Sequence, residues 1–341
     1  MGKCHPNQKE NRTMQTWKAE AFGPVEQVLE RVDAPDLAPP PADCVTVKVL
    51  AAAVGMPDVL MTKGEYPFVQ TPPVSAGSEV VGIVTEVAEG VEFAVGDKVM
   101  GLTLFMGGSG GFSEYCYMST KMLMTKVPTG MPDEQAAGFV VAYLTAHTGL
   151  VQRTKLLAGE TLLVLGASGG TGSTAVQLGK ALGATVVAVA GGPEKVAFCK
   201  SLGADHVVDY RAGSISEQVT DLVGTVDVIY DPVGGAAGED ALKSIGLGGR
   251  LALIGYGSGA WTKLDAGDMT ARGYSAMGVL PLHSTAEELD VAYRQLSDLY
   301  QKGKISVPVD KIYEFDAVRE AMIAVSKSQM LGKHIVRVSE A

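Results

Sequence analysis

A glycine cluster at residues 166–172 combines residue types and spacing that could bind a phosphate group. It reads GASGGTG, with glycine at positions 166, 169, 170 and 172. Because glycine has no side chain, the backbone N–H groups of such a loop can approach an anion closely. A helix that begins in the loop adds the partial positive charge of its N-terminus. The cluster therefore predicts a pyrophosphate-binding turn, with an ordinary tight turn as the alternative.

The segments on either side of the cluster are those that a dinucleotide-binding turn requires. TLLVLGA is a continuous apolar run, as expected for a strand buried on both faces. Residues 173–183 carry apolar side chains at helical spacing, and TVVAVAG reads as a second strand. This order of strand, turn, helix and strand favours nucleotide binding over an isolated glycine motif. The residues expected to line the turn are Gly166, Ala167, Ser168, Gly169, Gly170, Thr171, Gly172 and Gly191.

The end of the second strand indicates which dinucleotide is bound. NAD-binding folds place Asp or Glu there to bind the ribose hydroxyls, but TVVAVAGGPEK has no acidic residue before Glu194. Pro193 suits the first position of a helix, which puts Lys195 in the first turn. A lysine there opposes the helix dipole, and a bound 2′-phosphate would offset that penalty. The pattern favours NADPH, with a solvated surface lysine as the alternative reading.

The rest of the chain divides into two kinds of sequence around this turn. Its 341 residues are enough for two domains with separate cores. Short β-type segments dominate up to about Pro128, whereas strands and helices alternate in the middle third and predict a parallel sheet. We therefore expect an α/β fold: a doubly wound Rossmann sheet at 138–305 inserted into a β-rich domain at 14–137 plus 306–341, after a mobile tail at 1–13.

Composition and charge exclude several classes of protein. The net charge of −10 disfavours a broad nucleic-acid-binding surface, because phosphate contacts dominate that affinity, but it leaves a local basic patch open. Four widely spaced cysteines give neither a disulfide framework nor a zinc-ligand pattern. No apolar segment is long enough to cross a bilayer, and the N-terminus has no secretion signal. These features predict a soluble, cytoplasmic protein.

Taken together, the motifs resemble the zinc-independent NADPH:quinone oxidoreductase (zeta-crystallin-like) branch of the medium-chain dehydrogenase/reductase superfamily. The resemblance covers nearly the whole chain from Met14. It rests on VGMPDVLMTKGEYPF, PPVSAGSEVVGIVTEVAEGVEFAVGDKVMG, GGFSEY, TLLVLGASGGTGSTAVQLGKALGA, SLGADHVVDYR, YDPVGG and GRLALIGY. It implies a GroES-like catalytic domain, a Rossmann domain, a nicotinamide cleft between them, and a homodimer or homotetramer.

The resemblance also implies roles for single residues. Lys195 and Tyr210 would line the 2′-phosphate pocket, and Thr145 would pack behind the nicotinamide ring. Gly255 and Tyr256 would follow the strand that passes the cofactor. Val279 and Leu280, in MGVL, would approach the nicotinamide carboxamide.

The zinc-dependent branch of the superfamily differs at its metal ligands. It binds the metal through a Cys, the His of a GHE motif and a further Cys, and the matching positions here hold Gly55, Ser78 and about Val141. Without the metal, an alcohol has no Lewis acid to stabilise its alkoxide. The resemblance therefore implies hydride transfer from NADPH to a quinone or another activated α,β-unsaturated carbonyl, without zinc or flavin.

Three residues are candidates for contact with that acceptor. Tyr66 matches a substrate-facing tyrosine and could hydrogen-bond the carbonyl oxygen, or it could be a packing residue. Asp58 matches an aspartate that more often organises its loop than donates a proton, and Gly55 replaces an asparagine of the same motif. Tyr143 belongs to the helix that enters the Rossmann domain and is expected either near the cleft or in the core.

Two alternative functions remain open from the sequence. An enoyl-thioester (acryloyl-CoA-like) or enone double-bond reductase would use the same hydride chemistry. A nucleotide-binding protein without turnover, crystallin-like or RNA-binding, is the alternative outside enzymes, and the acidic net charge weakens its RNA-binding version.

Overall fold

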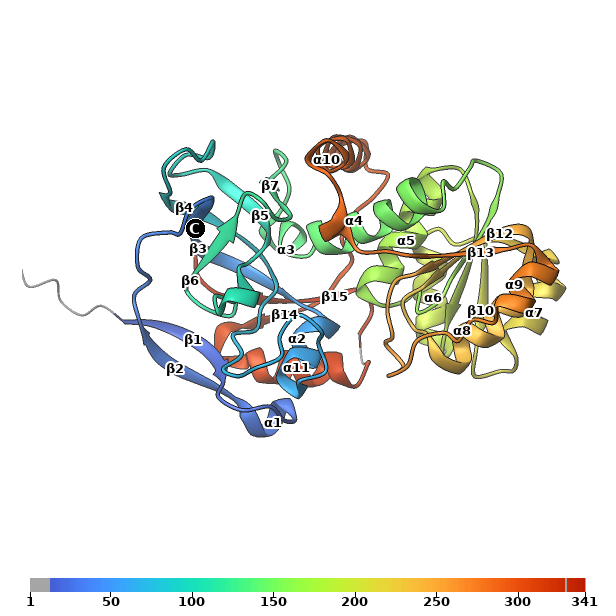
Figure 1. Cartoon of the computed structure of the whole chain (residues 1–341), viewed down its shortest axis with the longest axis horizontal. Coiled ribbons are helices and arrows are strands. Elements are labelled where there is room, and N and C mark those ends of the chain that lie inside the picture. The colour runs from blue at the N-terminus through green and yellow to red at the C-terminus, as the bar shows by residue number, and fades with distance from the viewer. Residues whose placement is uncertain (1–12, 329, 341) are drawn as a thin grey trace, which may run out of the picture.

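The computed structural model describes residues 13–328 and 330–340, and these form two lobes side by side (Figure 1). One lobe contains the N-terminal strands and the C-terminal elements, and the other contains the middle of the chain. Residues 1–12 of the expected tail lie outside the described residues. Thr13, which we also assigned to the tail, begins the first strand, β1 (Thr13–Ala19).

A seven-stranded sheet forms the centre of the first lobe. Its order is β14-β15-β3-β4-β5-β7, with β6 paired to β3. The central strand is β3 (Cys44–Val54), and its valine, leucine and alanine residues are buried on both faces. The other strands are β4 (Glu79–Val87), β5 (Lys98–Leu102), β6 (Tyr115–Ser119), β7 (Met124–Lys126), β14 (Val309–Glu314) and β15 (Lys333–Arg337). The C-terminal strands thus complete the sheet that the N-terminal segment begins.

Shorter elements cover this sheet. β1 forms a separate antiparallel hairpin with β2 (Leu29–Pro35). The helices of the lobe are α1 (Val25–Val28), α2 (Met56–Lys63), α3 (Asp133–Ala136) and α11 (Val318–Ser326). The buried residues of α11 are Val318, Ala321, Met322 and Val325, which is the face that its helical spacing predicts.

The second lobe contains a six-stranded sheet in which every neighbouring pair is parallel. The strands are β8 (Thr161–Val164), β9 (Thr185–Ala190), β10 (His206–Asp209), β11 (Val226–Asp231), β12 (Ile245–Leu253) and β13 (Ser275–Gly278). Their order, β10-β9-β8-β11-β12-β13, is that of a doubly wound dinucleotide-binding sheet. The direction of winding reverses between β8 and β11, and ligands bind outside the carboxyl ends of the strands at such a point. The predicted fold class is confirmed.

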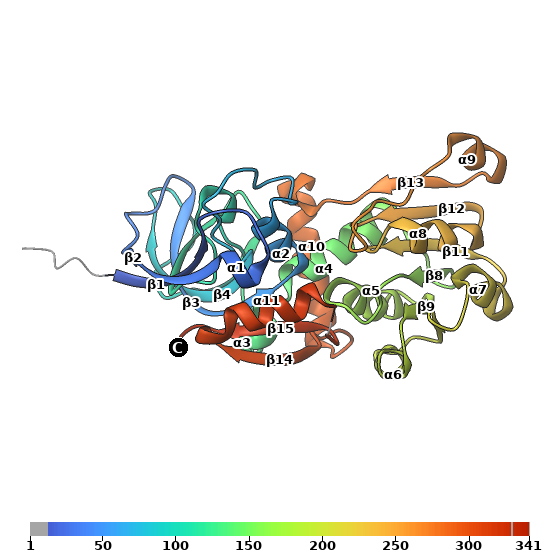
Figure 2. The same cartoon turned by 90° about the horizontal axis from the view of Figure 1, so that it is seen from below.

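The helices of this lobe connect the strands and pack around the sheet. They are α4 (Val140–His147), α5 (Gly170–Ala181), α6 (Pro193–Ser201), α7 (Ile215–Val223), α8 (Gly235–Ala241), α9 (Ala266–Arg272) and α10 (Ala286–Gln301). Figure 2 shows α5 beside β8 and β9, with which it is in contact. Among the described residues, no helix is both apolar enough and long enough to cross a membrane.

The junction between the lobes differs from the sequence expectation in one respect. The helical pattern of residues 131–152 predicts one helix, but α3 ends at Ala136 and α4 begins at Val140. Gly138 lies in the break, where a Cβ would be 3.3 Å from the stem of Lys333. A π-helical turn at Thr148–Arg153 then follows α4. One hydrophobic cluster, including Met100, Tyr143 and Val164, continues from lobe to lobe across this junction.

Candidate cofactor-binding and active site

The glycine cluster forms the turn between β8 and α5, at the point where the sheet reverses its winding. Gly166 has a φ of 56°, a left-handed conformation that favours glycine. A Cβ at Gly172 would be 2.2 Å from the Gly166 carbonyl oxygen, so only glycine allows α5 to approach the turn this closely. The N-cap residue of α5 is Gly169, which has no side chain to satisfy the N–H groups of the first turn. These groups are available to an anion.

The C-terminal segment of the first lobe contacts this turn. The Gly332 N–H donates to the Ser168 carbonyl at 2.8 Å, and Gly169 and Gly332 form an isolated parallel bridge. Since Gly332 directly precedes β15, this strand of the seven-stranded sheet begins beside the glycine turn. The turn is therefore positioned by both lobes.

The ends of β9 and β10 carry the residues predicted to bind a 2′-phosphate. Pro193 occupies the first turn of α6, as predicted, and the Lys195 ammonium donates to the Ser328 carbonyl at 2.8 Å. The half-exposed ring of Tyr210 lies against Gly191. Arg211 adds a second cation, with its guanidinium nitrogen 3.0 Å from the position that a Cβ at Gly192 would take.

An acidic residue is present here, but one of its carboxylate oxygens already accepts two backbone N–H groups. Asp209 Oδ1 accepts hydrogen bonds from the Gly192 N–H at 3.0 Å and the Arg211 N–H at 2.9 Å. These backbone N–H donors, that of Arg211 first, lower the pKa of Asp209. Asp209 thus fixes the turn between β9 and α6. The sequence reasoning missed Arg211, although the DYR motif contains it directly after Tyr210.

The ends of β11 and β12 meet on the other side of the glycine turn. Val233 Cγ2 lies 2.9 Å from the position of a Cβ at Gly166, which places the β11 loop against the turn. Gly255 donates to the Asp231 carbonyl at 3.2 Å, and Val279 donates to the Leu253 carbonyl at 3.0 Å. Leu280 follows Val279 at the end of this segment. The predicted nicotinamide-side residues therefore surround the carboxyl ends of neighbouring strands.

Tyr256 reaches across to the first lobe. Its hydroxyl donates to the Glu65 carbonyl at 3.1 Å, and its ring packs against Trp261 at a centroid distance of 4.9 Å. Tyr66, next to Glu65, packs against Phe68 and Phe105 at 5.6 and 6.2 Å. Aromatic side chains from both lobes thus gather around Tyr66.

Tyr66 and Asp58 occupy different environments. Burial raises the pKa of Tyr66 to about 12, and the nearby Asp58 and Tyr256 contribute to the shift. The phenol therefore keeps its proton at neutral pH. Asp58 is completely buried and accepts three backbone N–H groups, from Gly55 at 2.8 Å, Gly77 at 3.0 Å and Ser78 at 2.9 Å. Burial raises the pKa of Asp58, and the three donors oppose that shift. Asp58 organises its loop, so we do not retain it as a proton donor.

Tyr143 and Thr145 both use their hydroxyls within the fold. Tyr143 is 0% exposed and donates to the Ser306 carbonyl at 2.8 Å, so its catalytic assignment is corrected to a packing role. Burial raises the pKa of Tyr143 strongly. Thr145 is half-buried and donates to the Val141 carbonyl of its own helix at 2.6 Å.

Glu79 and Lys333 form a buried ion pair at the junction of the lobes. Glu79 Oε1 accepts the Val141 N–H at 2.8 Å, and Oε2 accepts from Lys333 Nζ at 3.1 Å. Burial raises the pKa of the Glu79 carboxyl, whereas Lys333 and the Val141 N–H lower it. Both carboxylate oxygens of Glu79 are therefore used in structural hydrogen bonds. Lys333 was not foreseen, since its GK dipeptide gives no sign of a distant partner.

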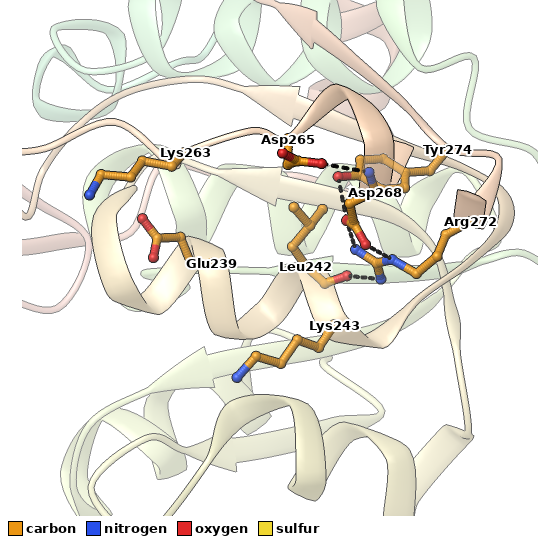
Figure 3. A pocket seen from close by; sticks show the side chains of 8 residues that line it. All are labelled: Glu239, Leu242, Lys243, Lys263, Asp265, Asp268, Arg272 and Tyr274. Carbon is orange, nitrogen blue, oxygen red and sulfur yellow. Dashed lines mark hydrogen bonds and ion pairs between the residues drawn. The ribbon is translucent and has the colours of Figure 1, made fainter. Parts of the chain in front are cut away.

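A separate open pocket of about 420 Å³ lies at the far end of the second lobe (Figure 3). Its lining residues are Glu239, Leu242, Lys243, Lys263, Asp265, Asp268, Arg272 and Tyr274. Asp268 accepts from both Arg272 and Tyr274, and Arg272 also donates to the Leu242 carbonyl at 2.9 Å. Because none of the lining residues is a predicted site residue, the pocket is not the candidate active site.

Metal-ligating side chains do not gather in the described ranges. Within residues 13–328 and 330–340, no group of three or more His, Cys, Asp or Glu residues could hold a metal ion. Gly55, Ser78 and Val141 instead donate their backbone N–H groups to the buried carboxylates of Asp58 and Glu79.

Two family profiles match the chain. Residues 41–129 match the alcohol dehydrogenase GroES-like domain, and residues 170–296 match the family described as zinc-binding dehydrogenase. The first match falls in the β-rich lobe and the second in the parallel-sheet lobe. The β-rich lobe therefore has the GroES-like architecture.

Known proteins resemble the chain over most of its length. Quinone oxidoreductase-like protein 2 of Bos taurus is 31% identical over 85% of this chain and 83% of its own. The crystal structure of Escherichia coli quinone oxidoreductase complexed with NADPH is 26% identical, has a TM-score of 0.87, and covers 95% of this chain and 100% of its own. A mycocerosic acid synthase-like polyketide synthase of Mycobacterium tuberculosis is 34% identical over 64% of this chain, which is only 10% of that protein.

Proposed function

Because this chain belongs to the quinone oxidoreductase-like branch of the medium-chain dehydrogenase/reductase superfamily, we propose that it reduces quinones or other activated α,β-unsaturated carbonyls with NADPH. The similarity to a quinone oxidoreductase-like protein over 85% of the chain supports an oxidoreductase of this superfamily. The observation that carries the proposal is the uncapped N-terminus of α5 at the reversal point of the parallel sheet.

The residues at this point fit a phosphorylated dinucleotide. The first turn of α5 offers N–H groups to the pyrophosphate, and the glycines leave space that a Cβ would fill. Lys195 and Arg211 supply positive charge for a 2′-phosphate beside the ring of Tyr210. The similar Escherichia coli enzyme was crystallised with NADPH. When bound between the lobes, NADPH supplies the hydride.

The acceptor would lie between the nicotinamide and the aromatic residues around Tyr66. A phenol that stays protonated can donate a hydrogen bond to a carbonyl oxygen as negative charge develops on it. The exposed ring of Phe68 beside Tyr66 suits a planar, apolar acceptor. Since Gly55 and Val141 have no ligating side chain, we propose that the reaction uses no zinc.

Purified protein incubated with NADPH or NADH and a panel of quinones, enones and enoyl thioesters tests this function. We expect loss of nicotinamide absorbance with quinones or enones and a preference for NADPH. Stoichiometric zinc in the active protein, or a clear preference for NADH, would contradict the corresponding part of the proposal.

An enoyl-thioester reductase is the second candidate. The similarity to a segment of a polyketide synthase favours it, although the chain covers only 10% of that protein. The same panel separates the two candidates, because a thioester reductase would turn over enoyl thioesters faster than quinones.

A further inference from the structure

A hydrogen bond from Tyr256 joins the two lobes beside Tyr66. The Tyr256 hydroxyl donates to the Glu65 carbonyl at 3.1 Å, across 191 positions of the sequence. Tyr66 directly follows Glu65, so the Tyr256 side chain meets the first lobe one residue from the phenol assigned to the acceptor. Because the acceptor atom of this bond belongs to the backbone, the bond fixes the distance between the lobes only where each lobe holds its own end rigidly.

The end of α2 fixes the first-lobe partner of this bond. Gly64 ends the helix in a left-handed conformation with a φ of 72°, and the Glu65 N–H donates back to the Leu60 carbonyl at 2.9 Å. A Cβ at Gly64 would be 2.8 Å from the ring of Phe22, so the chain packs closely at this point. The Glu65 carbonyl is therefore held in place by α2 and its cap.

The second-lobe partner lies on the loop after β12, which is anchored at both ends to the end of β11. Near the start of the loop, the Gly257 N–H donates to the Pro232 carbonyl at 3.1 Å. At its end, Thr262 donates its hydroxyl to the Asp231 carboxylate, and both side chains are buried. A Cβ at Gly238 would overlap the Thr262 hydroxyl, so only glycine leaves room for this anchor. The loop therefore holds its aromatic rings on a rigid base.

Apolar rings of the two lobes meet at this bond. Trp261 packs against Tyr256 at a centroid distance of 4.9 Å and is 51% exposed. On the first lobe, Phe68 packs against Tyr66 at 5.6 Å and is 44% exposed. An acceptor that comes from solvent to the Tyr66 hydroxyl therefore passes these rings, and the bond between Tyr256 and Glu65 sets how far apart they stand.

We propose that Tyr256 is a specificity-determining residue that limits the size of the acceptor. Through its bond to Glu65 it holds the acceptor site closed beside Tyr66, so that a quinone of one ring fits and a quinone of three fused rings is disfavoured. This inference rests on the proposed function. It gives Tyr256 a role toward the acceptor, separate from the place beside the coenzyme that the family resemblance implies.

Steady-state rates with 1,4-benzoquinone and 1,4-anthraquinone at saturating NADPH test the proposal. The measured quantity is the ratio of kcat/KM for the three-ring quinone to kcat/KM for the one-ring quinone, in which an effect on the coenzyme cancels. Tyr256→Ala removes both the ring and the bond, and it should raise this ratio about tenfold or more. Tyr256→Phe keeps the ring and loses only the hydrogen bond, so it should raise the ratio about threefold.

Two further variants separate the proposal from an effect on folding. Tyr117→Phe is the matched control, because the Tyr117 hydroxyl also donates to a backbone carbonyl, that of Ala38 at 2.6 Å, but within the first lobe. It should leave the ratio unchanged. Trp261→Ala removes a half-exposed ring and should raise the ratio, because Tyr256 loses its packing partner. Together with Tyr256→Phe, it carries the test if Tyr256→Ala does not fold.

Three results would overturn the proposal. One is an unchanged ratio in the folded Tyr256 and Trp261 variants, and another is an equal rise in the Tyr117→Phe control. The third is an equal change with both quinones together with a raised KM for NADPH, which would mean that Tyr256 acts on the coenzyme. All three require a wild-type protein that reduces quinones, whereas a wild-type protein that reduces neither quinones nor enones would contradict the proposed function itself.

Discussion

The ring of Tyr210 lies against the backbone of Gly191, with Cζ only 2.4 Å from the position that a Cβ at Gly191 would take. The ring therefore covers the end of β9, and any side chain at Gly191 would displace it. Arg211 places its guanidinium against Gly192, and Lys195 lies in the first turn of α6, which begins directly after Gly192. A phosphate on the adenosine ribose would meet both charges there.

Lys195→Ala and Arg211→Ala should each raise the KM for NADPH about tenfold and change the KM for NADH little, because only NADPH has a 2′-phosphate for a charge-assisted hydrogen bond. Initial rates with both coenzymes measure this. Lys200→Ala is the matched control, because Lys200 lies in the last turn of α6, the helix that contains Lys195. Equal changes in the KM for NADPH and the KM for NADH would mean that the substituted cation does not bind the 2′-phosphate.

Tyr66→Phe should lower kcat for quinone reduction about tenfold or more and leave the dissociation constant of NADPH unchanged, because the hydroxyl acts only on the acceptor oxygen. Since the pKa of Tyr66 is raised to about 12, the phenol remains protonated from pH 6 to 9. The ratio of wild-type to variant rates should therefore be constant over this range. A ratio that changes with pH in this range would mean that Tyr66 titrates during turnover.

Tyr143→Phe tests the packing role assigned to Tyr143. The Ser306 carbonyl also accepts from Gln177 Nε2 at 2.9 Å, so the variant leaves it with a partner. Loss of the Tyr143 hydrogen bond should lower the free energy of unfolding by about 1 kcal/mol and leave kcat unchanged. Denaturant unfolding and steady-state rates give the two values. A large fall in kcat with unchanged stability would mean that Tyr143 has a catalytic role.

The fold and the glycine turn could be predicted from the sequence because both depend on local patterns. The apolar run before Gly166 and the helical spacing after it determine the turn, although α5 begins at Gly170, before the apolar helical pattern. The buried face of α11 follows from the spacing of its apolar residues for the same reason.

Contacts between distant residues could not be predicted in this way. Glu79 and Lys333 are 254 positions apart, and neither local sequence indicates a buried partner. Tyr66 and Tyr143 are both aromatic residues near apolar segments. Only tertiary packing shows that the Tyr143 hydroxyl is already bonded to Ser306.

Stability should depend on pH through the Glu160–Arg250 ion pair, which joins the start of β8 to β12. The guanidinium donates to both carboxylate oxygens, with one distance of 2.9 Å, and this hydrogen bonding lowers the pKa of Glu160 from 4.5. A lowered pKa in the folded state gives stability that is complete above the unfolded value and is lost as the pH falls through the folded value. Glu160→Gln should cost about 1 kcal/mol at pH 7 and progressively less as the pH falls below 4.5.

Unfolding of wild-type and Glu160→Gln protein at several pH values measures this difference. Glu92→Gln, at an exposed position, is the control for removal of one charge. A cost that stays the same from pH 7 to pH 3 would show that the Gln side chain disturbs packing and that the charge is not responsible.

The free edge of the parallel sheet predicts self-association. Among the described strands, β13 pairs only with β12, so one side of its backbone is open to another strand. Leu247, near the beginning of β12 and beside Gly273, which precedes β13, is 90% exposed, and Trp261 and Leu264 are 51% and 40% exposed. We expect a homodimer in which this edge pairs with its copy, as the family resemblance implies.

Leu247→Glu should shift the protein toward monomer in sedimentation or light scattering, because it buries a charge in the interface. Val95→Glu, at an exposed valine of the other lobe, should not. Identical masses for wild-type and Leu247→Glu protein would place the interface elsewhere.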